Sequence, residues 1–116
     1  MRYFIQGVFF QEQGHPAQIL QTMFSGMFGT LDELEDHEGE MIDFYGESYM
    51  SYINLTPDTL TFVKVYRKRT DSIYYRFTKQ SDDTWQGEYK GDWTGTGICR
   101  CVVTRVPENF FHPTLF

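Results

Sequence analysis

The sequence has few of the residues, and none of the short motifs, on which most catalytic, metal and cofactor sites depend. Its 116 residues include two cysteines and three histidines, and it contains no nucleophile elbow, phosphate loop, zinc-protease motif or dinucleotide fingerprint. Cys99 and Cys101 would share one side of a strand with β-carbons roughly 6 to 7 Å apart, too far for a disulfide. We therefore expect two buried thiols in a reducing compartment, and no catalytic residue, metal or cofactor.

Long apolar runs and basic residues are also scarce. No apolar run approaches the roughly 20 residues that span a bilayer, and the first residues lack the apolar core and cleavage site of a signal peptide. Residues 1–63 hold one base, Arg2, and ten acids, whereas residues 64–116 hold nine bases and six acids, for a net charge of -6. A negative net charge disfavours binding to nucleic acid or anionic membranes. We expect a soluble cytoplasmic protein with neither as a partner.

Aromatic residues, by contrast, are abundant, at 18% of the chain. Together with β-branched residues they form alternating segments, separated by polar turns about every 10 to 12 residues, which is typical of an antiparallel sandwich or barrel. We predict an all-β fold, a single antiparallel meander barrel of about eight strands that forms one domain over residues 1–116. The expected strands cover residues 2–11, 24–34, 41–45, 49–55, 60–67, 72–79, 84–90 and 96–106.

The segment after the first strand is ambiguous between helix and strand. Apolar residues from Ile19 to Leu31 recur at the spacing of one helical face, and Pro16 suits a first helical turn. Gly26 and Gly29 would each cost a helix about 1 kcal/mol relative to alanine. We therefore predict a short helix or turn from Pro16 to about Met23, followed by the strand from Phe24 to about Leu34.

The last strands have a clearly apolar face, because side chains alternate across a strand. Glycines in this region suit strong curvature, and small residues of the last strand can face large ones of the preceding strand. The predicted inner surface consists of Ile73, Tyr75, Phe77, Trp85, Tyr89, Cys99, Cys101 and Val103.

Lys64 and Arg76 are cations within otherwise apolar strands. A hairpin would place Lys64 opposite Tyr75, and alternation puts Lys64 on the same face as Phe62 and Tyr66. Buried unpaired charges are costly, so each cation either points to water or anchors an anionic group in a cavity. The candidate ligand contacts, which alternation prevents from all facing inward without a bulge, are Lys64, Tyr66, Tyr75, Arg76, Trp85 and Tyr89.

The meander of short strands and the glycine-alternating segment Trp85-Gln86-Gly87-Glu88-Tyr89-Lys90-Gly91 resemble a small calycin-type barrel, the group of lipocalins, fatty-acid-binding proteins and avidins. The chain differs from this group in having Gln6-Gly7-Val8 where a Gly-x-Trp motif would stand in the first strand. The resemblance implies a small, mostly apolar ligand inside the barrel.

Four functions are consistent with these observations, and one of them, an acidic inhibitor that imitates a nucleic-acid surface, rests only on the excess of acids in residues 1–63. The other three are as follows. The first is a noncatalytic protein that binds a small apolar molecule in the barrel. The second is a protein-protein interaction module or homodimer that uses an edge strand and the aromatic tail from Asn109 to Phe116. The third is a small enzyme that uses Glu88 with Tyr89 or Tyr74, which no residue spacing favours. We expect the first.

Overall fold

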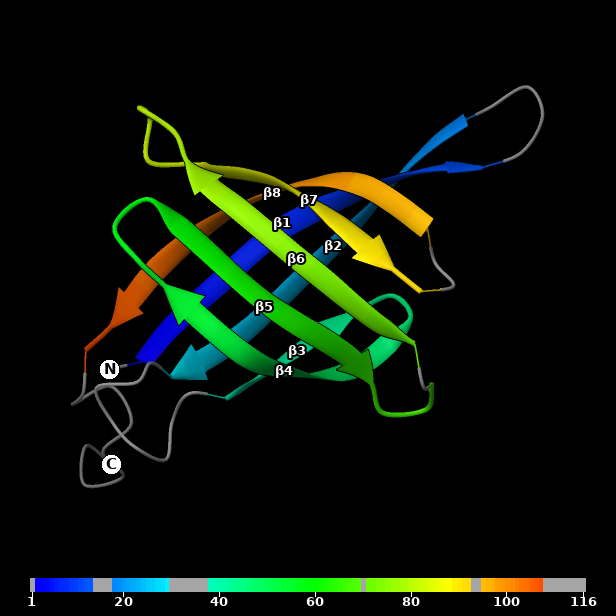
Figure 1. The fold of residues 1–116 in the computed structure, drawn as a ribbon, viewed down its shortest axis with the longest axis horizontal. Helices are drawn as coiled ribbons and strands as arrows, with labels where there is room; N and C mark the ends of the chain where they lie inside the picture. Colours follow the sequence, from blue (N-terminus) through cyan, green and yellow to red (C-terminus); the bar gives the residue numbers. More distant parts are fainter. Residues whose placement is uncertain (1, 14–17, 30–37, 70, 93–94, 108–116) are drawn as a thin grey trace, which may run out of the picture.

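The computed structural model describes residues 2–13, 18–29, 38–69, 71–92 and 95–107. They form a closed antiparallel barrel in which each strand pairs with the next along the chain and the last pairs with the first (Figure 1). The predicted all-β meander of eight strands is therefore confirmed. The strands are β1 (Arg2–Gln13), β2 (Gln18–Gly29), β3 (Gly39–Asp43), β4 (Gly46–Leu55), β5 (Thr59–Tyr66), β6 (Ser72–Lys79), β7 (Trp85–Gly91) and β8 (Gly95–Val106).

The interior of the barrel is filled by the side chains on one face of each strand. In β5 the exposure alternates at every residue, so that Leu60, Phe62, Lys64 and Tyr66 are all buried. The predicted inner surface is confirmed, because seven of its residues are buried and Val103 packs against them. Cys99 and Cys101 are both buried and free, as their spacing predicted.

Small residues do face large ones across the last two strands. Tyr89 of β7 lies directly opposite Gly97 of β8, and a β-carbon at position 97 would collide with the Tyr89 ring. The glycine therefore provides the space in which this buried tyrosine lies, and the Tyr89 hydroxyl donates a hydrogen bond to the Phe10 carbonyl oxygen at 2.8 Å.

The short helix or turn predicted from Pro16 to about Met23 is not found in the part of that segment that the structure describes. Residues 18–23 belong to β2, which pairs with β1 from Arg2↔Gly29 to Gln13↔Gln18, while Pro16 lies outside the described residues. The two strands form a long ribbon that extends beyond the rest of the barrel (Figure 1). Continuous backbone pairing with β1 outweighs the helical spacing of the apolar residues. No helix in the described residues is long and apolar enough to cross a membrane.

The pairing of β5 with β6 differs by two residues from the predicted one. Lys64 lies opposite Ile73, not Tyr75, and Thr61 lies opposite Arg76. A shift of two keeps each side chain on its predicted face. The pairing of β4 with β5 also contains an unpredicted β-bulge, between Ser51 and Asn54.

Candidate ligand-binding site

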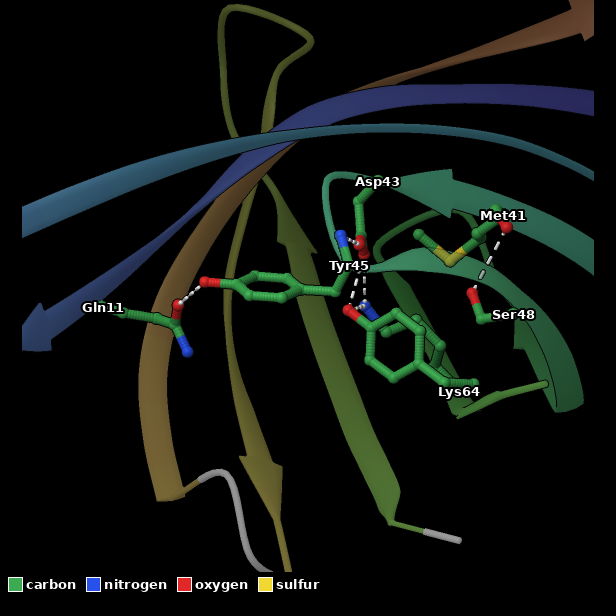
Figure 2. A network of polar contacts seen from close by, with 7 residues as sticks. Gln11, Met41, Asp43, Tyr45, Ser48 and Lys64 are labelled. Atoms are coloured by element: carbon green, nitrogen blue, oxygen red, sulfur yellow. Dashed lines mark hydrogen bonds and ion pairs between the residues drawn. The ribbon is translucent and has the colours of Figure 1, made fainter. Parts of the chain in front are cut away.

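The most unusual feature of the interior is a buried ion pair. Lys64 and Asp43 both have fully buried side chains, and the Lys64 Nζ lies 3.0 Å from the Asp43 Oδ2. The Lys64 ammonium also donates a hydrogen bond to the Tyr66 hydroxyl oxygen at 2.9 Å, and that hydroxyl donates to Asp43 Oδ2 at 2.7 Å. Figure 2 shows the side chains of Asp43 and Lys64 pointing toward each other. Lys64 therefore points into the barrel interior and not to water.

The carboxylate reaches Lys64 because of a tight turn between β3 and β4. Asp43 pairs with Gly46, which has a φ of 122°, a conformation that favours glycine. The backbone N–H of Tyr45 in this turn donates to Asp43 Oδ1 at 2.8 Å. One carboxylate oxygen therefore holds the turn, and the other binds Lys64 and Tyr66.

Aromatic rings surround the ammonium group. Its Nζ lies 4.5 Å from the centroid of the Tyr66 ring, 5.1 Å from that of Phe9 and 5.2 Å from that of Tyr75. Desolvated contacts of this kind contribute about 2 kcal/mol or more. The rings therefore offset part of the cost of removing the charge from water.

Burial shifts the proton equilibria of this cluster. It lowers the pKa of Lys64, because a dry interior disfavours the ammonium, and the Asp43 carboxylate opposes that shift. Burial raises the pKa of Tyr66, and the hydrogen bond to Asp43 raises it further. Burial also raises the pKa of Tyr75 and of Tyr89. The phenols therefore remain protonated donors at neutral pH.

Tyr45 covers this cluster from the β3–β4 turn. Its ring centroid lies 6.4 Å from that of Phe9 and 6.5 Å from that of Tyr66, and its hydroxyl donates to Gln11 Oε1 at 3.1 Å. Figure 2 shows this link from the turn to Gln11. The Arg69 guanidinium lies 5.8 Å from the Tyr45 ring centroid. The ion pair is thus enclosed and satisfied by its own neighbours, and we interpret it as structural.

The opposite half of the barrel contains a hollow of about 680 Å³ that is open to solvent. Trp85, at the start of β7, contributes a buried aromatic side chain. The apolar residues in the lining are Tyr3, Ile53, Leu55, Pro57, Trp85 and Val103, and the polar ones are Asn54, Thr56, Lys79, Asp83 and Arg105.

A third feature is a groove of about 500 Å³ on the outer face of strands β4 to β8. Arg76 lines this groove, because its side chain is exposed whereas those of its neighbours Tyr75 and Phe77 are buried. Arg76 therefore takes the solvent-facing alternative of the sequence prediction.

The six predicted contacts do not form one site. Lys64, Tyr66, Tyr75 and Tyr89 fill the half of the barrel that contains the ion pair. Trp85 lines the hollow in the other half, and Arg76 lies outside.

Asp43 was not among the predicted contacts, although it lies within the expected strand 41–45 and forms β3 with its neighbours. Alternation provides a usable signal, since Asp43 lies two residues after the buried Met41 on the same face of β3. A lysine on an apolar face also requires a counter-charge.

Comparison of the sequence with protein-family models finds no match, and comparison with curated protein sequences finds none either. The number, order and closure of the strands are consistent with a calycin-like barrel. Within the described residues, no three His, Cys, Asp or Glu side chains come together as metal ligands would.

Proposed function

We propose that this chain is a noncatalytic, calycin-like binding protein whose ligand is a small, mostly apolar acid. The observation that carries the proposal is the hollow of about 680 Å³ around Trp85. Its volume lies within the range of about 300 to 1,000 Å³ in which small-molecule sites fall.

The lining of the hollow supports an apolar body for the ligand. Ile53 and Trp85 are both buried residues that border it, and Val103 extends the apolar surface along β8. Each methylene that a ligand buries there contributes about 0.8 kcal/mol. A chain of several methylenes would therefore gain enough free energy for measurable binding.

The polar residues of the lining support an acidic head group. Arg105 lies two residues after Val103 on the same side of β8, at the exposed end of the hollow. Lys79 adds a second cation, whose ion pair with Asp83 is long, at 3.6 Å, and exposed to solvent. Exposed pairs of this kind contribute little, so Lys79 can turn to a ligand carboxylate at small cost.

Fluorescence of Trp85 tests this proposal. In a Trp93→Phe variant Trp85 is the sole tryptophan, and we expect titration with decanoate to produce a saturable change in its emission. Arg105→Gln should weaken decanoate binding but leave binding of 1-decanol unchanged, because the alcohol carries no charge. Arg100→Gln, on the outer face of the same strand, is the matched control. No saturable change, together with no bound mass in native mass spectrometry, would refute the proposal.

A second candidate function, self-association, is favoured by one edge of the β1–β2 ribbon. The ladder between β2 and β3 covers only Phe24 to Phe28, so among the described strands residues 18–23 of β2 pair with β1 alone. On this edge Ile19 is 66% exposed and Met23 is 76% exposed. An unpaired apolar edge is a template for another strand.

Light scattering across a range of protein concentrations tests self-association. We expect a dimer that Met23→Lys dissociates, and a monomer at all concentrations would exclude the idea. The aromatic tail from Asn109 to Phe116, which the same prediction invoked, lies outside the described residues.

A further inference from the structure

The bulge in β4 holds a tyrosine in an unusual backbone conformation. Between the pairs Ser51↔Val63 and Asn54↔Thr61, β4 has two residues where β5 has one. Tyr52, the first of the two, has a φ of 52°. Residues other than glycine, asparagine and aspartate rarely adopt this backbone conformation. The next residue, Ile53, is buried in the core. The bulge thus keeps Ile53 inside while Tyr52 points outward.

The consequence is an exposed aromatic ring beside a groove. Tyr52 is 82% exposed and borders the outer groove of about 500 Å³ that also contains Arg76. A second aromatic residue of the groove, Tyr74, is 53% exposed. Bulges often redirect a side chain at functional sites, and a strained residue is an observation from which a function can be inferred.

Polar side chains from neighbouring strands also line the groove. Arg76 of β6 lies opposite Glu88 of β7, and Tyr74 lies opposite Lys90. In the described part of the chain, neither Arg76 nor Glu88 takes part in an ion pair, so donors and a carboxylate acceptor face the groove without protein partners. Hydroxyl groups come from Thr61 and Thr96.

We propose that this groove binds a short, neutral oligosaccharide. The exposed faces of Tyr52 and Tyr74 are electron-rich and attract the polarised C–H groups of a pyranose ring. The ring hydroxyls would accept hydrogen bonds from Arg76 and donate to Glu88, which satisfies groups that a purely apolar ligand would leave desolvated and unpaired.

The charges of the groove and of the whole chain disfavour a phosphate-rich ligand. Arg76 and Lys90 are offset in part by Glu88, and the net charge of the protein is -6. Nucleic acid binding relies on several cations that neutralise phosphates. The proposal is independent of the hollow around Trp85, because the two linings share no residue.

The test is a set of calorimetric titrations of the full chain with cellohexaose, maltohexaose and the hexamer of N-acetylglucosamine. We expect saturable binding of at least one of them, and a loss of about tenfold or more in affinity for Tyr52→Asn. Asparagine tolerates the left-handed conformation, so this variant removes the ring and keeps the bulge.

Tyr49→Asn is the matched control. Tyr49 is an exposed tyrosine on the same strand, with Arg67 stacked 4.4 Å from its ring centroid, and it does not line the groove. Its replacement should leave the affinity unchanged. Failure of all three hexasaccharides to bind would overturn the proposal, as would binding that is equally strong in Tyr52→Asn. A melting temperature of Tyr52→Asn below that of the wild type would overturn the inference that Tyr52 is strained.

Discussion

Removal of either member of the Lys64–Asp43 pair should strongly destabilise the fold. Both side chains are fully buried, with the Lys64 Nζ and the Asp43 Oδ2 at 3.0 Å. An uncompensated buried charge costs about 3 to 5 kcal/mol, a large part of the roughly 5 to 15 kcal/mol that stabilises a domain. We therefore expect Asp43→Asn and Lys64→Met each to lower the free energy of unfolding by about 3 kcal/mol or more.

The double variant separates the ion pair from the packing around it. Without either charge, methionine fills the space of the lysine stem, and the Tyr66 hydroxyl can still donate to the amide oxygen at position 43. Buried ion pairs are often replaced by neutral groups at little cost. We expect the double variant to lie within about 2 kcal/mol of the wild type, which gives a coupling of about 4 kcal/mol or more in the double-mutant cycle.

Urea denaturation, followed by circular dichroism at neutral pH, measures all three variants. The matched control is Glu40→Gln, which breaks the ion pair of Glu40 with Arg67. That pair has the same 3.0 Å separation but is exposed to solvent, with side-chain exposures of 70% and 39%. Its loss should cost less than about 1 kcal/mol. The reasoning would be refuted if Asp43→Asn and Lys64→Met each lost no more free energy of unfolding than Glu40→Gln. It would also be refuted if the losses of the two single variants simply added in the double variant.

Two further predictions concern the thiols and the glycine beside Tyr89. Burial raises the pKa of Cys99 from 9.0 to about 12 and also raises that of Cys101. The unfolded chain therefore loses these protons first, so stability should be intact below pH 9 and fall above it by about 1.4 kcal/mol per pH unit per thiol. The lowered pKa of Lys64 acts in the opposite sense, so the wild type is compared with a Cys99→Ala, Cys101→Ala variant that keeps Lys64. Equal slopes of stability against pH in the two proteins, measured by urea denaturation from pH 9 to 11, would contradict the prediction for the thiols. Gly97→Ala should lower the free energy of unfolding by about 1 to 3 kcal/mol, because the added methyl group collides with the buried Tyr89 ring. Thr96→Ala, on the exposed side of the same strand, should have little effect, and an equal loss in both variants would show that the collision is relieved.

Much of the barrel could be predicted because its strands alternate strictly. From Thr59 onward the predicted and observed strand bounds agree within one residue, and every residue of the predicted inner surface faces the core. The segment of β2 was ambiguous because its apolar residues occupy both faces. Phe24 and Phe28 point into the core while Ile19 and Met23 are exposed, and this distribution imitates the spacing of a helix.

The candidate sites depended on contacts that no local pattern specifies. Asp43 reaches Lys64 from two strands away, across 21 positions of sequence, so their contact depends on the pairing of both strands with β4. The bulge at Tyr52 gives no local signal either, because tyrosine is a common strand residue and the sequence contains no glycine at that position. The pairing of β5 with β6 was displaced by two because the length of the intervening turn was misjudged.

The central claim, that a small apolar acid binds in the hollow around Trp85, is tested most directly by isotope-filtered nuclear Overhauser measurements between unlabelled decanoate and the uniformly ¹³C-labelled protein. The predicted result is contact between the ligand methylenes and the side chains of Ile53, Trp85 and Val103, which line the hollow. Contacts confined to the outer face of the barrel, or no contacts at a saturating ligand concentration, would contradict the claim.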